Sequence, residues 1–315
     1  MKTIDVVLFL TLGDTLMGSV IVHAIKTKYP ESYIRFHTNI EYKTLLENNP
    51  EIDEIIAVPN NNYMNVYSWI AKSGRASDHI VKLAMANQFD TCWHHNPETY
   101  DMHMIDWYAS RAGLDLKIED YNVRIYPTTD DYITALSLTK DLGPYIIMHT
   151  TSLLESKNWP IQFFNHLASM LEDKYHLPII QIGGPIDTKI TKAISLLDKT
   201  SVKVSAALIN NAKMYIGIDS GSAYIAGAAG IPTFLVMGAT SGTDPNGSRV
   251  GPVGSNVHYI EPLARPDSPH CKPVCVTHCA LNAPCINLVL PEQVFAVIEN
   301  AVPSLTGLDI IKTKE

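Results

Sequence analysis

The stretch YIGIDSGSAYIAGAAGIPTFLVMG, residues 215–238, decides the fold. Its first apolar run predicts a buried strand, an Asp-Ser-Gly step follows, and small residues at helical spacing lead to a second apolar run. A strand, a crossover helix and a second strand form the repeating unit of a parallel sheet. Gly221 lets a ligand approach the backbone at the helix start, where N–H groups attract phosphate. The alternative is that Asp219 or Ser220 only caps the helix.

The same alternation of strands and helices extends outward over most of the chain. Before the quoted stretch, the pattern predicts strands at 5–10, 33–38, 54–58, 89–94, 145–150 and 178–184 and a short one near residue 202. It predicts helices at 15–28, 41–49, 78–87, 99–112, 160–174, 187–198 and 205–212. A polar stretch at about 115–143 interrupts the pattern, and we interpret it as a connection. The sequence therefore predicts an α/β fold of two Rossmann-like domains, 1–140 and 141–315, whose parallel sheets face each other across a cleft.

Length and composition agree with a folded two-domain protein. The chain has 315 residues, 46% of them hydrophobic and 18% charged. A formal charge of −8 disfavours a broad nucleic-acid surface. No apolar run reaches membrane length, and the N-terminus lacks the pattern of a signal peptide. We therefore expect a cytoplasmic protein without a transmembrane segment, while a peripheral membrane contact stays open.

Polar loops follow three strands of the second predicted sheet, at the edge where open α/β sheets bind ligands. Hydroxyl groups and a lysine in the first loop suit a diphosphate, and a carboxylate after a Gly-Gly turn suits a ribose diol. The three loops contain Thr150, Thr151, Ser152 and Lys157; Gly183, Gly184 and Asp187; and Asp219, Ser220 and Gly221. Together they predict a nucleoside diphosphate site, although Lys157 taken alone is better interpreted as a solvated loop lysine.

The order and spacing of these motifs resemble glycosyltransferase family 9, the ADP-heptose:lipopolysaccharide heptosyltransferase family. The resemblance rests on LGDTLMGSVIVHAIKTKYPESYIRFHTN in the first half and on HTTSLLESKNWP, IQIGGPID and AALINNAKMYIGIDSGSAYIAGAAGIPTFLVMGAT in the second. It implies the GT-B fold and a nucleotide-diphospho-sugar donor, with an ADP-sugar favoured.

By this resemblance, Asp14 corresponds to the general base, and its neighbour Gly13 is assigned to the donor site. Lys157 corresponds to a phosphate-binding lysine. A carboxylate after the first strand can accept the proton of an acceptor hydroxyl. The alternative is that Asp14 is the N-cap of a helix that begins near Thr15. The chain departs from the family at Tyr224, where histidine is frequent, so we expect Tyr224 to alter the donor contacts.

Residues of the segment TCWHHNPETY are candidates for the acceptor side. His94, His95 and Tyr100 follow a predicted strand of the first domain and are expected to face the cleft. Ordinary loop histidines are the alternative interpretation.

Four of the five cysteines lie in one short C-terminal segment. Cys271, Cys275, Cys279 and Cys285 are separated by three, three and five residues, which differs from the Cys-x-x-Cys pairs of structural zinc sites. Similar clusters belong to the family resemblance. Reduced thiols and a structural zinc or iron both stay open, and we expect catalysis to need no cofactor.

The sequence thus predicts an inverting, metal-independent glycosyltransferase that moves a heptose or another sugar to an acceptor hydroxyl, as in lipopolysaccharide core. The acceptor is a saccharide or another hydroxyl compound. Two alternatives remain open, namely a sugar-nucleotide epimerase of GT-B fold and a non-catalytic nucleotide-binding protein.

Overall fold

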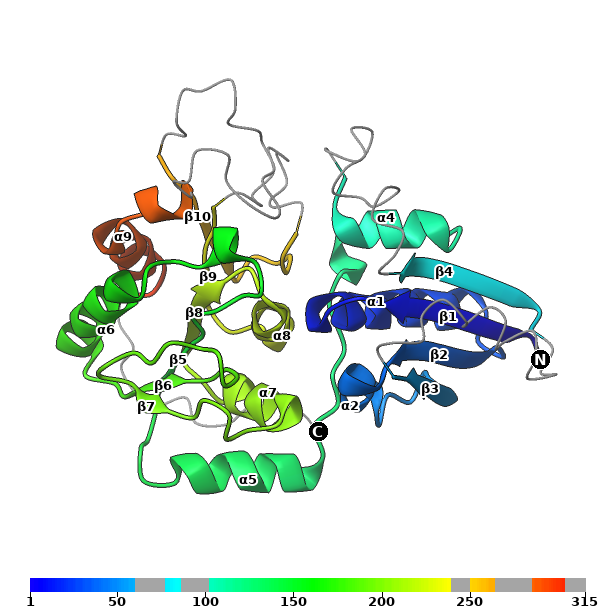
Figure 1. Cartoon of the computed structure of the whole chain (residues 1–315), viewed down its shortest axis with the longest axis horizontal. Helices are drawn as coiled ribbons and strands as arrows, with labels where there is room; N and C mark the ends of the chain where they lie inside the picture. Colours follow the sequence, from blue (N-terminus) through cyan, green and yellow to red (C-terminus); the bar gives the residue numbers. More distant parts are fainter. Residues whose placement is uncertain (60–76, 86–101, 239–249, 264–284, 304–315) are drawn as a thin grey trace. The chain divides into compact units, whose positions relative to one another are not determined.

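The protein has two compact α/β units in the computed structural model shown in Figure 1, which describes residues 1–59, 77–85, 102–238, 250–263 and 285–303. The units comprise Met1–Thr128 and Thr129–Glu315. The division therefore lies earlier in the chain than the expected 140/141 boundary. Helix α5, Thr129–Thr139, accounts for the difference because it packs against α7, Val202–Asn210. The amide of Asn210 donates a hydrogen bond to the Tyr132 hydroxyl at 2.9 Å.

The first unit contains a parallel sheet with the strand order β3-β2-β1-β4. The chain moves from β1 to β2 and β3 on one side and later adds β4 on the other side of β1. Gly18 of α1 allows close packing on this sheet, since a Cβ there would lie 2.8 Å from the Phe36 ring. The described strands and helices are β1 Thr3–Phe9, β2 Tyr33–Asn39, β3 Glu54–Val58, β4 His79–Met85, α1 Leu12–Lys28, α2 Lys43–Leu46 and α4 Met104–Arg111.

The helix expected at residues 78–87 is wrong, because β4 occupies this segment and pairs with β1. Val81 and Leu83 are buried while Lys82 between them is exposed. That alternation has the period of a strand. Apolar residues at nearby positions are compatible with either period in so short a segment, and pairing with the buried β1 decides the outcome.

The second unit contains a parallel sheet with the strand order β10-β9-β8-β5-β6-β7. Because β5 continues to β6 on one side while β8 continues to β9 on the other, the winding direction reverses between β5 and β8. The remaining bounds are β5 Ile146–Met148, β6 Ile179–Gln181, β7 Ile194–Ser195, β8 Met214–Ile218, β9 Thr233–Val236, β10 Val257–Ile260, α6 Ile161–Tyr175, α8 Gly221–Ala229 and α9 Pro291–Ala301.

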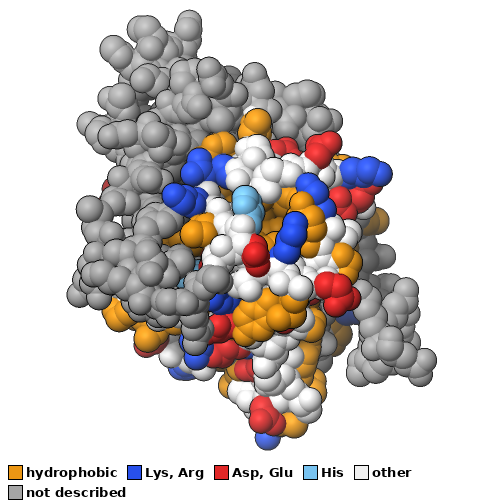
Figure 2. All heavy atoms as spheres, turned by 90° about the vertical axis from the view of Figure 1, so that its right-hand side faces the viewer, with side chains coloured by type: hydrophobic (Ala, Val, Ile, Leu, Met, Phe, Trp, Pro, Cys, Tyr) orange, Lys and Arg blue, Asp and Glu red, His pale blue; other side chains and the backbone are white. Residues whose placement is uncertain are grey.

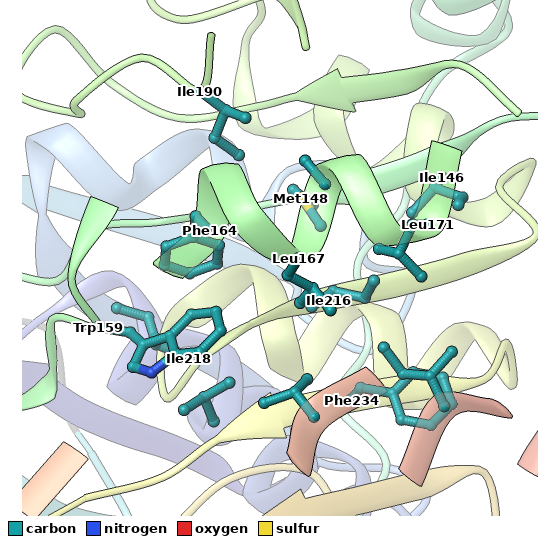
Figure 3. Packing of buried hydrophobic residues seen from close by; sticks show 14 of the residues in the cluster. Ile146, Met148, Trp159, Phe164, Leu167, Leu171, Ile190, Ile216, Ile218 and Phe234 are labelled. Carbon is teal, nitrogen blue, oxygen red and sulfur yellow. The ribbon is translucent and has the colours of Figure 1, made fainter. Parts of the chain in front are cut away.

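Helices cover both faces of the second sheet. Figure 1 shows α6 and α9 along one face and α7 and α8 along the other. On the α6 side, alternate residues of the strands join the helix in a hydrophobic core that includes Ile146, Ile216 and Leu167 (Figure 3). The two parallel sheets and the helices packed on them confirm the predicted α/β fold class with two Rossmann-like domains.

The helix expected at residues 187–198 is also wrong, since this segment is irregular apart from the short strand β7. Its backbone amides bond to side chains of other elements. Ile190 donates its N–H to Gln181 Oε1 at 2.8 Å, and Thr191 donates to Asn165 Oδ1 at 2.7 Å. These partners replace the hydrogen bonds of a helix, so the helix-like spacing of apolar residues is misleading here.

Two surface properties bear on the predicted partners. Figure 2 shows one face on which the described basic and acidic side chains lie among hydrophobic and uncharged ones, rather than in one basic area. Within the described part of the chain, no helix has both the length and the hydropathy needed to cross a bilayer.

Candidate active site

Asp14 lies in the first turn of α1, directly after β1, where the first sheet changes its winding direction. The carboxylate Oδ2 accepts the backbone N–H of Thr11 at 3.0 Å and the Thr11 hydroxyl at 2.5 Å. Thr11 is the N-cap, and Asp14 is the third helical residue that completes a capping box. Asp14 is therefore not the N-cap of a helix that begins at Thr15. Gly13 is half-buried in the same turn.

The other oxygen of Asp14 contacts a tyrosine that is distant in sequence. Tyr108, fully buried on α4, donates its hydroxyl to Asp14 Oδ1 at 2.7 Å. Asp14 itself is only 7% exposed. Three hydrogen bonds thus hold the carboxylate of Asp14 in one orientation next to the edge of the first sheet.

The predicted donor loops meet at the reversal between β5 and β8. The segment after β5 contains Thr150 to Lys157, and the segment after β8 contains Asp219 to Gly221. The carboxyl ends of two neighbouring strands with opposite winding form the usual ligand position of an open α/β sheet. Trp159 anchors the first segment, because its ring packs in the core against Phe164 (Figure 3). Its ring N–H also donates to Val289 O at 2.8 Å.

Lys157 and Asp219 form an ion pair across this reversal. Lys157 Nζ lies 2.6 Å from Asp219 Oδ2, and the two side chains are 15% and 6% exposed. The structure thus joins two residues that the sequence assigned to the same ligand. A lysine held in this position is close to the start of α8, since Asp219 immediately precedes its N-cap residue, Ser220.

Ser220 does not use its side chain to cap α8. Its hydroxyl lies 3.1 Å from Nδ1 of His149 and 3.1 Å from the hydroxyl of Ser222. Ser222 in turn lies 2.7 Å from the Tyr215 hydroxyl, and burial raises the pKa of Tyr215 to about 12. Because the N-cap hydroxyl is directed to His149, it leaves the backbone donors at the helix start to other partners, such as an anion.

His149 connects Ser220 to Asp187. Its Nε2 lies 3.7 Å from Asp187 Oδ1. Burial lowers the pKa of His149, because desolvation penalises the imidazolium, and the nearby Asp187 carboxylate opposes this shift. The neutral imidazole is therefore the favoured form in the folded protein.

The carboxylate of Asp187 accepts hydrogen bonds from the Gly-Gly turn that precedes it and from Thr150. Its Oδ2 accepts the N–H of Gly184 at 2.9 Å, and its Oδ1 accepts the Thr150 hydroxyl at 3.3 Å. At Gly183, which has φ +153°, a Cβ would lie 2.6 Å from the Asp187 carboxyl carbon, so the turn requires glycine. A hydrogen bond of the Asp187 carboxylate to the ribose diol of the donor remains a prediction.

The hydroxyl residues of the first loop differ in burial. Thr150 is buried and accepts a hydrogen bond from the amide of Gln181 at 3.1 Å. Thr151 and Ser152 are half-buried, and the hydroxyls of Thr150 and Thr151 lie 3.2 Å apart. The backbone N–H of Ser152 donates to Asn158 Oδ1 at 2.6 Å, which closes the loop. Thr151 and Ser152 are thus the more accessible of these predicted donor residues.

Tyr224 is buried on α8, and its hydroxyl accepts the backbone N–H of Gly251 at 2.7 Å. It therefore supports the segment that precedes β10. A direct contact between Tyr224 and the donor stays a prediction.

Several predicted residues lie outside the described residues, namely His94, His95, Tyr100, Cys271, Cys275 and Cys279. Cys285 is described, and it is buried at the start of a 3-10 helix. Within the described ranges, no group of three or more His, Cys, Asp or Glu side chains has the arrangement of a metal site. The described residues thus give no support to a structural metal.

Sequence analysis missed two residues that contact predicted site residues, namely His149 and Tyr108. His149 lies at the carboxyl end of the strand predicted at residues 145–150 and directly follows β5, so the rule that placed the threonines at this sheet edge also applies to it. For Tyr108 no sequence signal exists, because it contacts Asp14 across 94 positions and looks like any core aromatic residue.

Comparison with known proteins relates the chain to one family. The sequence model of glycosyltransferase family 9 (heptosyltransferase) matches residues 129–280. Lipopolysaccharide heptosyltransferase 3 of Escherichia coli K12 is 24% identical over 276 residues, which cover 72% of this chain and 80% of that protein.

Two solved structures show the same fold. A family 9 glycosyltransferase from Veillonella parvula superposes with a TM-score of 0.73 at 18% identity, over 95% of this chain and 96% of the other. The E. coli ADP-heptose LPS heptosyltransferase II gives a TM-score of 0.63 at 16% identity, over 96% and 99% of the two chains.

Proposed function

We propose that this chain is a glycosyltransferase of family 9 that moves a heptose from an ADP-linked donor to a glycan hydroxyl. The donor class is supported by the similarity of this fold to that of an enzyme named for ADP-heptose. The acceptor class is supported by the heptosyltransferase 3 relative, which is named for lipopolysaccharide. We infer that the acceptor is a saccharide of lipopolysaccharide core.

One observation carries the donor assignment, the ion pair of Lys157 with Asp219 beside the start of α8. A departing nucleoside diphosphate gains negative charge as its bond to the sugar breaks. A lysine and a helix N-terminus stabilise that charge, and they do so without a metal ion. The Ser220 hydroxyl bonds to His149 instead of capping α8, which supports the use of this helix start by phosphate oxygens.

In the proposed reaction, Asp14 is the general base. Its carboxylate takes the proton of the acceptor hydroxyl while the acceptor oxygen forms a bond to the anomeric carbon of the donor sugar. The bond from that carbon to the diphosphate oxygen breaks, and its electron pair leaves with the diphosphate. Attack opposite to the leaving group inverts the anomeric configuration.

A ligand panel tests the donor assignment. We expect ADP to raise the melting temperature of the protein more than UDP, GDP or CDP at equal concentration, because a ligand that binds only the folded state stabilises it. In Lys157→Ala the ADP-induced shift, measured against the melting temperature of that variant alone, is expected to be smaller. The control is Lys192→Ala, which removes a lysine from the exposed ion pair with Glu172 and should retain the shift.

A transfer assay tests the reaction. ADP release from ADP-heptose in the presence of lipopolysaccharide core oligosaccharide should be lost in Asp14→Asn, while ADP binding is retained. Binding of ADP without transfer in the unchanged protein would favour the non-catalytic nucleotide-binding alternative. No response to any diphosphate would refute the donor site.

A further inference from the structure

The two carboxylate oxygens of Asp14 have different hydrogen-bond partners. Oδ2 accepts two hydrogen bonds from Thr11, one from the backbone at 3.0 Å and one from the hydroxyl at 2.5 Å. Oδ1 accepts one, from the Tyr108 hydroxyl at 2.7 Å. An ionised carboxylate offers about two acceptor positions on each oxygen. Among the described residues, these contacts therefore occupy both positions of Oδ2 and only one of Oδ1.

We propose that Oδ1 of Asp14 is the atom that takes the acceptor proton, and that Tyr108 is the positioning residue that orients it. The inference rests on the proposed role of Asp14 as general base. The acceptor hydroxyl donates to the remaining position of Oδ1, and its proton moves to Oδ1 as the acceptor oxygen attacks the anomeric carbon. The electron pair of the broken sugar–phosphate bond leaves with the diphosphate.

The surroundings of Tyr108 suit a positioning role. It is fully buried on α4, which packs against α1, the helix that carries Asp14. The ring of Trp107 lies 5.3 Å from its ring. Asp14 has only 7% exposure, so the carboxylate has little solvent to replace a lost donor. A rigid phenol at 2.7 Å thus restricts the rotation of the carboxylate and leaves one direction for the acceptor.

The variant Tyr108→Phe keeps the ring and removes the hydrogen bond. We expect kcat to fall about tenfold. This is less than the loss of the general base itself would cause, which is about 10²–10⁴-fold, because Asp14 is still present and only its orientation is less restricted. We also expect the acid limb of the kcat/KM profile to move to higher pH, because the ionised carboxylate loses a donor. ADP affinity should be unchanged, since ADP binding is assigned to the second unit.

A matched control is Tyr121→Phe. Tyr121 is also largely buried in the first unit, and its hydroxyl donates to Asp106 of α4 rather than to Asp14. It should alter neither kcat nor the acid limb. A second variant, 3-fluorotyrosine at position 108, preserves the packing and makes the phenol a stronger donor, so the acid limb should move to lower pH.

The assay measures ADP release from ADP-heptose with lipopolysaccharide core oligosaccharide as acceptor, from pH 5 to 9. Wild-type kcat and an unmoved acid limb in both Tyr108 variants would overturn the inference, even if Asp14→Asn is inactive. Retained transfer in Asp14→Asn would instead overturn the proposed base itself. If Tyr108→Phe does not fold, the fluorotyrosine shift alone decides.

Discussion

Single and double replacements at Lys157 and Asp219 separate the structural role of this ion pair from its role in ligand binding. Lys157→Ala leaves a carboxylate with 6% exposure beside the position that a cation had occupied at 2.6 Å. Asp219→Asn leaves an ammonium group with 15% exposure without its carboxylate. The double variant carries neither charge, so it contains no buried charge that has lost its counterpart.

The burial of the pair sets the expected loss in the free energy of unfolding. Exposed ion pairs contribute ~0–1 kcal/mol. Removing one partner of a fully buried pair costs ~3–5 kcal/mol, because the other charge stays in a poorly solvated position. Since Lys157 and Asp219 keep a small accessible fraction, we expect about 2–3 kcal/mol for either single variant and about 1 kcal/mol for the double variant.

The affinity for ADP should rank the three variants differently from their free energies of unfolding. The double variant regains stability relative to the single variants, but it still lacks the lysine. Its affinity for ADP should therefore equal that of Lys157→Ala, about tenfold weaker than that of the wild type, or ~1.4 kcal/mol in binding free energy. Asp219→Asn should bind ADP at least as tightly as the wild type, because a carboxylate beside the phosphates is gone.

Urea unfolding and isothermal titration with ADP measure the two properties, and hydrogen exchange of peptides from β8 assigns the stability change to the second unit. The exposed pair Lys192–Glu172 is the control, and Lys192→Ala should cost less than about 1 kcal/mol. If the double variant loses the sum of the two single losses, the side chains act independently and the reasoning from burial is refuted. If it binds ADP like the wild type, Lys157 does not contact the diphosphate.

Two further predictions concern buried titratable groups. Burial lowers the pKa of His149 despite the Asp187 carboxylate, so below about pH 6.5 the unfolded chain takes up a proton that the folded protein does not. The melting temperature of the wild type should therefore fall more between pH 8 and pH 5.5 than that of His149→Asn, and equal falls would contradict this. Burial alone would raise the pKa of Asp5, but hydrogen bonds from His37 and Arg35 hold it well below its usual range. Asp5→Asn should cost about 3 kcal/mol in urea unfolding because the buried Arg35 guanidinium loses its carboxylate, and an unchanged midpoint would disprove the role of this pair.

Local patterns predict the central features of the second unit. The strand at residues 214–218 and the helix after it follow from an uninterrupted apolar run and a small-residue helix. The sequence also predicts that Lys157 and Asp219 lie at the same sheet edge, because each follows a strand of the same parallel sheet. Rules that depend on neighbouring residues succeed here because both strands are central and fully buried.

The failures have a common cause in contacts between distant residues. Residues 78–87 form a strand because β1 offers a partner, and residues 187–198 are irregular because Gln181 and Asn165 bind their backbone amides. The Tyr108–Asp14 hydrogen bond spans 94 positions. No pattern within a window of about twenty residues contains this information.

The geometry of the second unit explains why a buried histidine would be useful next to a helix start that we propose to bind phosphate. A serine at the N-cap normally bonds to the helix backbone and competes there with an anion. Here the Ser220 hydroxyl pairs with Nδ1 of His149, and Asp187 lies on the other side of the same ring at 3.7 Å from Nε2. Because a neutral imidazole has one donor and one acceptor nitrogen, the proton on Nε2 can face Asp187 while Nδ1 accepts from Ser220. The histidine thereby directs the serine away from α8 without adding a positive charge that would hold the diphosphate product after transfer.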